Sequence, residues 1–319
     1  MTIRSTRRSL LAAGGTAGVV LGAAACSSSD PFEEDTAQGG GEGAAPSDGG
    51  GAGGSSTLVI GSQAYYSNEI IAELFAQVLE AEGFTVERQF QIGQREVYVP
   101  ELESGSLDVL PEYLGNLLQH YEPDAPSASP EEIHSALGEA LPGALRVLDF
   151  AEASDQDSYT TTAAFAQEHS LTTIADLAGI PDLRIAANSE FEVRPYGPEG
   201  AKSIYGVDVT VVPVEDSGGP LTVQALTDGD VQLADIYTAD PAIAANDLVV
   251  LEDPESMILP QNVVPLVTEK VDETAAAAIE RVIEQLSADD LVAINQRSVE
   301  EQANSATIAT DWLGEKGLV

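Results

Sequence analysis

Residues 57–90, TLVIGSQAYYSNEIIAELFAQVLEAEGFTVERQF, predict a strand, a helix and a second strand in that order. The apolar run at 58–60 is typical of a buried strand, and Gly61 and Ser62 supply the turn after it. Residues 68–83 have the apolar spacing of an amphipathic helix and end at a glycine. Residues 84–90 then alternate like a strand. This order predicts two parallel strands joined by a crossover helix.

The alternation of strands and helices continues to the C-terminus. In the first part we expect a helix at 95–104, a strand at 107–110, helices at 112–121 and 130–141, and a strand at 144–150. Further on we expect strands at 159–162, 184–186, 209–214 and 231–237, a helix start at 173–177 and a helix at 221–228. The last part predicts strands at 248–251 and 263–267 and helices at 273–286 and 288–304. Such alternation predicts a mostly parallel sheet covered on both faces.

These elements predict an α/β protein of two lobes, with chain crossings near 151–155 and 236–241. The first lobe would comprise residues 57–153 and 240–319, and the second lobe residues 154–239. Ligands in such folds bind at the carboxyl ends of the strands, where loops from both lobes meet. We therefore expect a binding site between the lobes.

The N-terminal segment has the features of an export signal. Residues 1–25 begin with arginines and continue as an apolar run diluted by glycine, and Cys26 follows three alanines. The site resembles the lipobox of bacterial lipoproteins, in which the cysteine is acylated after cleavage. The glycine-rich segment 26–56 would then be a disordered tether on the outer face of the cell membrane. The alternative is an ordinary secretory signal with an incidental cysteine.

Composition excludes several classes of function. The chain has 53 acidic and 13 basic residues, a net charge of -40, which argues against nucleic acid as a partner. Its single cysteine excludes disulfides and thiolate chemistry in the folded part. The three histidines have no metal-ligand spacing, and we expect no metal and no cofactor.

Asp155 and Asp157 could form an acid/base pair, but close carboxylates are expected by chance in so acidic a chain, so we predict no catalytic residue. The sequence Gly218-Gly219-Pro220 before a helix is a weak anion-site signal.

Several sequence blocks, in order, resemble the substrate-binding proteins of ABC transporters for glycine betaine, choline, carnitine and proline betaine. The blocks are 61–63, 92–96, 102–116, 189–194, 216–220, 224–226 and 234–238, within a similarity that runs from about residue 58 to 313. The resemblance implies a two-lobed, type II periplasmic binding protein fold with the ligand in the cleft. It also implies an osmoprotectant ligand, a permease and its ATPase subunit as partners, and a monomer.

The resemblance also implies ligand-binding residues. Tyr113 and Tyr237 match tyrosines of an aromatic cage, Gln63 lies in the first strand-to-helix turn, and Arg194 matches an arginine that holds a betaine carboxylate. Asn116, Asp155, Asp157 and Thr238 complete the predicted set. A quaternary ammonium has no N–H to donate, so aromatic faces bind it by cation–π contact, worth roughly 0.5–2 kcal/mol each.

The predicted cage departs from the family pattern. Asp157 stands where relatives with a full cage carry a further tyrosine. The gap leaves three possibilities open: another aromatic residue completes the cage, a carboxylate such as Asp157 pairs with the cation, or the ligand is not a quaternary amine. The candidate aromatic residues are Tyr65, Tyr66, Phe191 and Tyr196. The competing functions are a receptor for a polyamine, amino acid or aromatic compound, an exported enzyme, and a structural lipoprotein.

Overall fold

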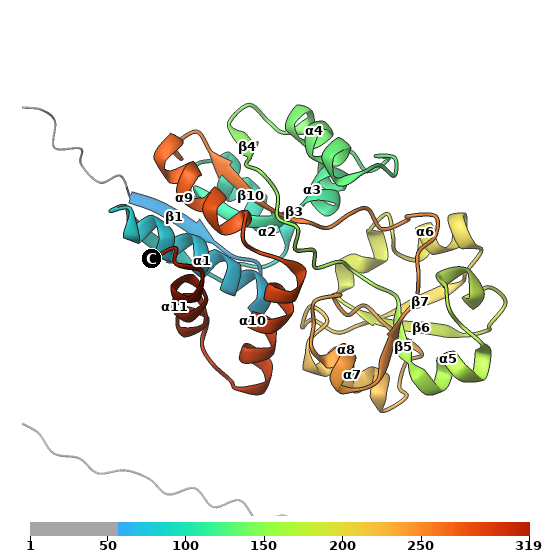
Figure 1. The fold of residues 1–319 in the computed structure, drawn as a ribbon. Coiled ribbons are helices and arrows are strands. Elements are labelled where there is room, and N and C mark those ends of the chain that lie inside the picture. Colours follow the sequence, from blue (N-terminus) through green and yellow to red (C-terminus); the bar gives the residue numbers. More distant parts are fainter. Residues whose placement is uncertain (1–56) are drawn as a thin grey trace, which may run out of the picture. The chain divides into compact units, whose positions relative to one another are not determined.

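The first lobe is formed by both ends of the described chain. The computed structural model describes residues 57–319. The elements of this lobe are β1 (Thr57–Gly61), α1 (Tyr66–Ala81), β2 (Thr85–Gln89), α2 (Arg95–Glu103), β3 (Val109–Tyr113), α3 (Leu114–Tyr121), α4 (Pro130–Ala140), β4 (Leu145–Val147), β10 (Val263–Thr268), α9 (Glu273–Ile283), α10 (Ala288–Glu300) and α11 (Ser305–Lys316) (Figure 1).

The sheet of the first lobe is mixed, in the order β2-β1-β3-β10-β4. β1 pairs in parallel with both β2 and β3, as the predicted strand-helix-strand unit requires. β10 lies between β3 and β4 and runs antiparallel to both. All six residues of β10 are buried. The returning C-terminal part of the chain therefore supplies a central strand, and the sheet is not mostly parallel as expected.

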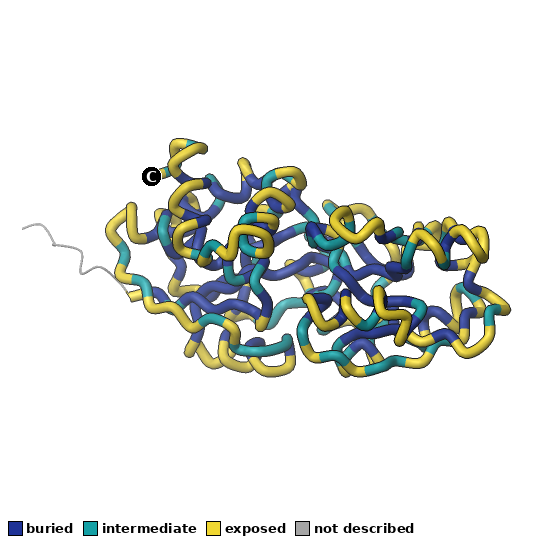
Figure 2. The backbone as a smooth tube through the Cα atoms, turned by 90° about the horizontal axis from the view of Figure 1, so that it is seen from below, coloured by how far each residue is buried: buried dark blue, intermediate teal, exposed yellow. Residues whose placement is uncertain are grey.

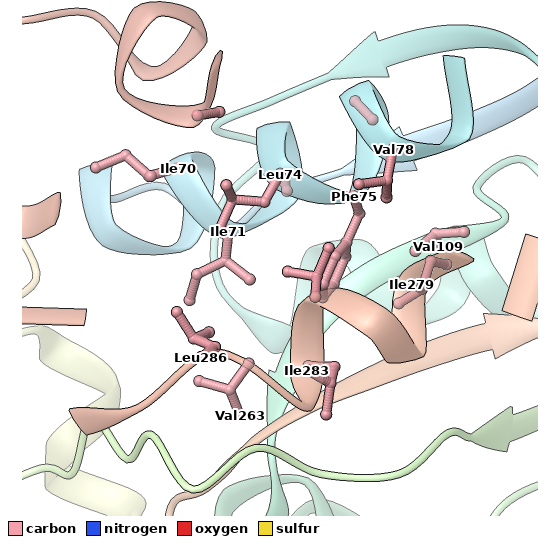
Figure 3. Close-up of a cluster of buried hydrophobic side chains, with 14 of the residues drawn as sticks. Ile70, Ile71, Leu74, Phe75, Val78, Val109, Val263, Ile279, Ile283 and Leu286 are labelled. Carbon is pink, nitrogen blue, oxygen red and sulfur yellow. The ribbon is translucent and has the colours of Figure 1, made fainter. Parts of the chain in front are cut away.

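The core of the first lobe lies between α1 and the C-terminal helices. Ile71 and Phe75 of α1 pack with Ile279 and Ile283 of α9 and with Val263 of β10, and none of the five exposes more than 2% of its surface (Figure 3). Each fully buried side chain of this size contributes roughly 1.5–3 kcal/mol relative to exposure. The helix expected at 68–83 is confirmed, and its apolar face positions the turn that follows β1.

The strand before α3 lies later in the chain than predicted. We expected a strand at 107–110 and a helix from residue 112, but β3 continues to Tyr113 and α3 begins at Leu114. Glu112 and Tyr113 pair with Val264 and Val263 of β10. The partner strand, which lies about 150 residues away, keeps this segment extended. As a result Tyr113 ends a strand and faces the region between the lobes.

The second lobe has its own mixed sheet in the order β7-β6-β8-β5-β9. Its strands are β5 (Thr160–Thr162), β6 (Leu183–Ala187), β7 (Val209–Pro213), β8 (Leu233–Ala234) and β9 (Leu248–Val250). Its helices are α5 (Ala163–His169), α6 (Pro198–Gly200), α7 (Pro220–Thr227) and α8 (Ala242–Ala245), with the 3-10 segments η1 (Ile174–Leu177) and η2 (Ser189–Val193) and the π-helical segment η3 (Ala201–Tyr205). In Figure 2 the buried residues lie mostly in the interior of the molecule, and the exposed residues lie along its outer turns.

The second sheet includes β9, which we expected in the first lobe. β9 runs antiparallel to β5, and Leu251, Met257 and Ile258 belong to the core of the second lobe. The chain therefore returns to the first sheet after Ile258 and not near residue 240. A short apolar run such as 248–251 predicts a buried strand, but nothing in it specifies which of two sheets it joins.

Three stretches of chain lie where the lobes meet: the chain crosses between the lobes in the first, near residue 154, and in the third, near residue 262, whereas the middle stretch, near residue 239, only contacts the first lobe. Ser154 and Asn262 form an isolated bridge between the first and third stretches. In the middle stretch, the backbone N–H of Ala239 donates to the carboxylate of Asp155 at 3.0 Å, and Asn295 of α10 donates to the carbonyl of Ala239 at 3.1 Å. The crossing predicted near 236–241 thus does contact the first lobe, but the chain turns back into the second lobe before it leaves.

The predicted signal segment 1–25, Cys26 and the tether 26–56 lie outside the described residues. Within residues 57–319, no helix combines the length and the apolar character needed to cross a membrane.

Candidate functional site

A cavity of about 40 Å³ lies between the lobes, at the carboxyl ends of β1, β3, β6 and β8. Residues from both lobes line it: Gln63, Tyr65, Gln94, Arg95, Tyr113, Asn116, Asp155, Asp157, Asn188, Glu190, Phe191, Arg194, Tyr196, Asp235 and Tyr237. The position agrees with the general rule for ligand sites in open α/β sheets.

All of the predicted ligand-binding residues except Thr238 line this cavity: Gln63, Tyr113, Asn116, Asp155, Asp157, Arg194 and Tyr237. Thr238 instead contacts the first crossing, because its hydroxyl accepts a hydrogen bond from the backbone N–H of Gln156 at 2.9 Å. The side-chain nitrogen of Gln63 is buried and has no hydrogen-bond partner among the described residues. Since a buried donor without a partner costs about 1–3 kcal/mol, this nitrogen is suited to a ligand acceptor.

Three tyrosines form the aromatic part of the cavity. The hydroxyl of Tyr65 donates to that of Tyr113 at 2.6 Å, and the ring of Tyr65 meets the ring of Tyr237 edge-on, with 5.1 Å between centroids. Burial raises the pKa of all three phenols, so they stay neutral. Of the candidates for the missing cage position, Tyr65, Phe191 and Tyr196 line the cavity. Tyr66 does not, and its hydroxyl donates to Asp240 at 2.8 Å.

Buried carboxyl groups face these rings. Asp155, Asp157 and Asp235 expose 5%, 7% and 6% of their surfaces. Burial raises the pKa of Asp155 to about 7, although bonds from Ala239 and Ser67 oppose the shift. Burial and the neighbouring charge of Asp157 raise the pKa of Asp235 well above its usual range. A side-chain hydrogen bond with Asp157 also raises the pKa of Asp235, which favours its protonated form.

Asp157 is held in place by a chain of side-chain amides. Asn116 donates to the carboxylate of Asp157 at 2.7 Å, and Gln261 donates to the side-chain oxygen of Asn116 at 2.6 Å. Asn116 lies on α3 of the first lobe, whereas Gln261 lies in the stretch near residue 262 where the chain returns to the first lobe. The carboxylate is thus oriented from both the first lobe and the crossing.

Two arginines also reach the cavity, and each has its own carboxylate. Arg95 makes a two-bond pair with Glu112, both at 2.7 Å, and burial of that pair is nearly complete. Arg194 of the second lobe bonds Glu96 of the first lobe at 2.7 and 3.3 Å. A fork of this kind fixes the guanidinium in the plane of the carboxylate. The Arg194 pair also links the lobes.

The loop before α7 shapes another wall. Gly218 has φ +75, and a Cβ there would lie 2.9 Å from the carbonyl oxygen of Asp235, so this position requires glycine. Ser217 accepts a hydrogen bond from Gln94 of the first lobe at 3.3 Å. Asp216 accepts from the backbone N–H of Leu221 at 2.6 Å, so the start of α7 is occupied by a carboxylate of the chain itself. The weak anion-site signal at 218–220 is explained by this internal cap.

Several cavity residues are absent from the predicted set: Gln94, Arg95, Asn188, Glu190 and Asp235. All but Asn188 lie inside the sequence blocks that carry the family resemblance, and Asn188 directly precedes one of them. The blocks therefore contained the signal, but one sequence does not show which positions in a block face a ligand. Within residues 57–319, no group of histidine, cysteine, aspartate and glutamate side chains is arranged to hold a metal ion.

Comparison with known proteins identifies the family. Residues 56–315 match the model for the substrate-binding domain of ABC-type glycine betaine transport systems, OpuAC. The chain belongs to this family. Members of the OpuAC family are solute-binding proteins that act outside the cytoplasm as parts of ABC importers.

Curated OpuAC-like relatives cover most of the chain. It is 24% identical over 274 residues to the glycine betaine-binding protein YehZ of Escherichia coli (strain K12), covering 81% of this chain and 90% of that protein. It is 25% identical over 278 residues to the glycine-betaine-binding protein of Pseudomonas aeruginosa, covering 82% and 88%.

Solved structures show that the fold is the two-lobed periplasmic binding protein fold. A glycine betaine/carnitine/choline ABC transporter structure has TM-score 0.67 and 22% identity, covering 82% of this chain and 99% of that chain. A choline binding protein in complex with choline has TM-score 0.58 and 15% identity, covering 82% and 89%. The fold predicted for this OpuAC member is confirmed.

Proposed function

We propose that this chain captures a small quaternary-ammonium osmoprotectant between its lobes and delivers it to an ABC permease driven by an ATPase subunit. The observation that carries the proposal is the cavity itself: three neutral tyrosine rings, contributed by both lobes, face a group of buried carboxyls. Aromatic faces and carboxylates are the groups that bind a cation without N–H donors. No bond is made or broken in this function.

The residues predicted from the sequence take specific roles in this proposal. Tyr113 and Tyr237, together with Tyr65, contact the ammonium group, and Asp157 offsets its charge. Gln63 and Asn116 supply polar contacts at the edge of the site.

Calorimetric titration of the purified full chain with choline, glycine betaine, carnitine and proline betaine tests the ligand class. We expect saturable one-to-one binding of at least one of the four. If none binds, while a polyamine or an amino acid does, the ligand class is wrong. Mass spectrometry of solute retained through purification provides an independent check.

We further propose that the mature protein is a monomer anchored to the outer face of the membrane by acylated Cys26. A Cys26→Ser variant should appear in the culture medium and lose the mass of the lipid. Its ligand affinity should be unchanged, because Cys26 lies outside the binding fold. Retention of the variant at the membrane would contradict the anchor.

A further inference from the structure

The charged side chains around the cavity are unequally partnered. The acidic side chains are Asp155, Asp157, Asp235 and Glu190, and the basic ones are Arg95 and Arg194. Arg95 is paired with Glu112 and Arg194 with Glu96. Among residues 57–319, no lysine, arginine or histidine forms an ion pair with any of the four acidic side chains. The arginines of the cavity thus have carboxylate partners, whereas its carboxyl groups have no basic partner.

The pairing of the arginines limits what they can do for a ligand. The guanidinium of Arg95 donates two bonds of 2.7 Å to Glu112, which also accepts from Tyr98 at 2.6 Å, and all three side chains are buried. Removing one partner from such a buried ion pair is strongly destabilising, because it leaves the other charge buried and uncompensated. Arg95 is therefore not free to bind a ligand carboxylate.

Arg194 faces the same competition at a less buried place. Its side chain is 16% exposed, and that of Glu96 is 50% exposed. A ligand carboxylate at Arg194 must displace or share with Glu96, and it must also approach Glu190, whose buried carboxylate oxygen has no hydrogen-bond partner among the described residues. Both conditions disfavour a ligand that carries a carboxylate.

We infer that the cavity selects a monocation without a carboxylate, of the hydroxyalkyl quaternary-ammonium class, over a zwitterionic betaine, and that Asp157 is the residue that selects it. The inference rests on the proposed function and narrows its ligand class. The ammonium group lies against Tyr65, Tyr113 and Tyr237 and offsets the charge of Asp157. A hydroxyl on the ligand can donate to a carboxylate oxygen, whereas a carboxylate on the ligand is repelled.

The test is a comparison of choline and glycine betaine by calorimetry on the full chain and on single variants. We expect the wild type to bind choline at least tenfold more tightly than glycine betaine. Asp157→Asn should weaken choline binding at least tenfold and change betaine binding less than threefold. Asp208→Asn removes the same formal charge from an exposed position and should leave both affinities unchanged.

A gain-of-function variant tests the arginine part of the inference. Glu96→Gln removes the carboxylate that occupies Arg194, so it should strengthen betaine binding several-fold and leave choline binding within twofold. This variant also remains informative if an aspartate variant fails to fold, which a thermal melt would reveal.

The outcomes separate the inference from the proposed function. If choline, glycine betaine, carnitine and proline betaine all fail to bind, both the proposed function and the inference are wrong. If only carnitine or proline betaine binds, the proposed function stands and the inference is wrong. If betaine binds as tightly as choline or more tightly, the proposed function stands and the selection is wrong. If choline is preferred but Asp157→Asn does not change the preference, the assignment to Asp157 is wrong.

Discussion

Tyr237 is the residue at which the second lobe contributes its aromatic face. Tyr237 lies shortly after β8, two positions beyond Asp235. The centroid of its ring is 5.1 Å from that of Tyr65 in the first lobe. It also packs against the core of the first lobe. One side chain therefore belongs to the site and to the contact between the lobes.

Tyr237→Ala should weaken choline binding by about 10- to 30-fold, because a desolvated cation–π contact is worth about 2 kcal/mol. Tyr237→Phe keeps the ring and is the matched control, expected within threefold of the wild type. Calorimetry gives both values. Equal losses in the two variants would show that the hydroxyl and not the ring face carries the contact.

Arg194→Ala should weaken choline binding less than Tyr237→Ala does, since choline has no carboxylate.

Asp155 makes stability depend on pH. Its pKa is about 7 in the folded protein, raised by burial, against about 3.9 for an unperturbed aspartate. Between pH 4 and pH 7, roughly, Asp155 is protonated in the folded state and ionised in the unfolded state. The free energy of unfolding must therefore fall as the pH rises through this range and then level off.

We expect the melting temperature to fall between pH 5 and pH 7.5, and Asp155→Asn to remove part of that fall. The variant keeps an oxygen that can accept from Ser67 or from the backbone N–H of Ala239. Thermal melts of both proteins across this pH range measure the difference. Parallel curves would show that Asp155 does not carry the effect.

At the scale of elements, the loop before α7 positions the part of the chain that carries Asp235 and Tyr237. Gly218 has φ +75 and lies against the backbone of that segment, whereas Gly229 has φ +78 and nothing within 4 Å of a Cβ. The two glycines share a left-handed backbone and differ only in what surrounds them.

Gly218→Ala should therefore lower the melting temperature, and it should also weaken choline binding at least tenfold. The reason for both effects is that the added methyl group displaces the backbone at Asp235. Gly229→Ala should lower stability by roughly 1–2 kcal/mol through backbone strain and leave affinity unchanged. Thermal melts and calorimetry on both variants distinguish local strain from displacement of the site. Equal affinity in the two variants would contradict this role of the loop.

The elements also show how much the sequence could predict. The strands and helices from 57 to 103 follow from apolar spacing and turn residues, which are local signals along the chain. β9 was assigned to the wrong lobe and β3 began too early, because both depend on strands distant in the chain. Most site residues could be placed through the family blocks. The ion pair between Arg194 and Glu96 could not be predicted, because the two residues are 98 positions apart and lie on different lobes.

At the scale of the whole molecule, side-chain pairs join the two lobes beside the cavity. The cavity has about 40 Å³, and the pairs Arg194–Glu96 and Gln94–Ser217 join the lobes beside it. The Arg194–Glu96 pair is partly exposed, and such pairs contribute about 0–1 kcal/mol each. Opening by this route therefore requires little free energy.

Combining Gln94→Ala with Arg194→Ala should shift the unliganded protein toward open forms. We expect the radius of gyration from small-angle X-ray scattering to rise relative to the wild type, and saturating choline to reduce the difference. An unchanged radius would mean that the crossings and not these side chains set the angle between the lobes. The Asp208→Asn variant serves as a control for nonspecific charge effects.

The placement of β10 has a consequence for how the molecule is made. The second lobe is one continuous stretch of chain, so all of its strands are present once β9 has been synthesised. The first sheet cannot be completed until β10 has been synthesised, because β10 lies between β3 and β4. Until then β3 and β4 have no partner between them, and exposed strand edges invite pairing with other chains. Folding is therefore expected to finish at the N-terminal lobe last, and a chain truncated before residue 263 should form the second lobe and leave the first unassembled.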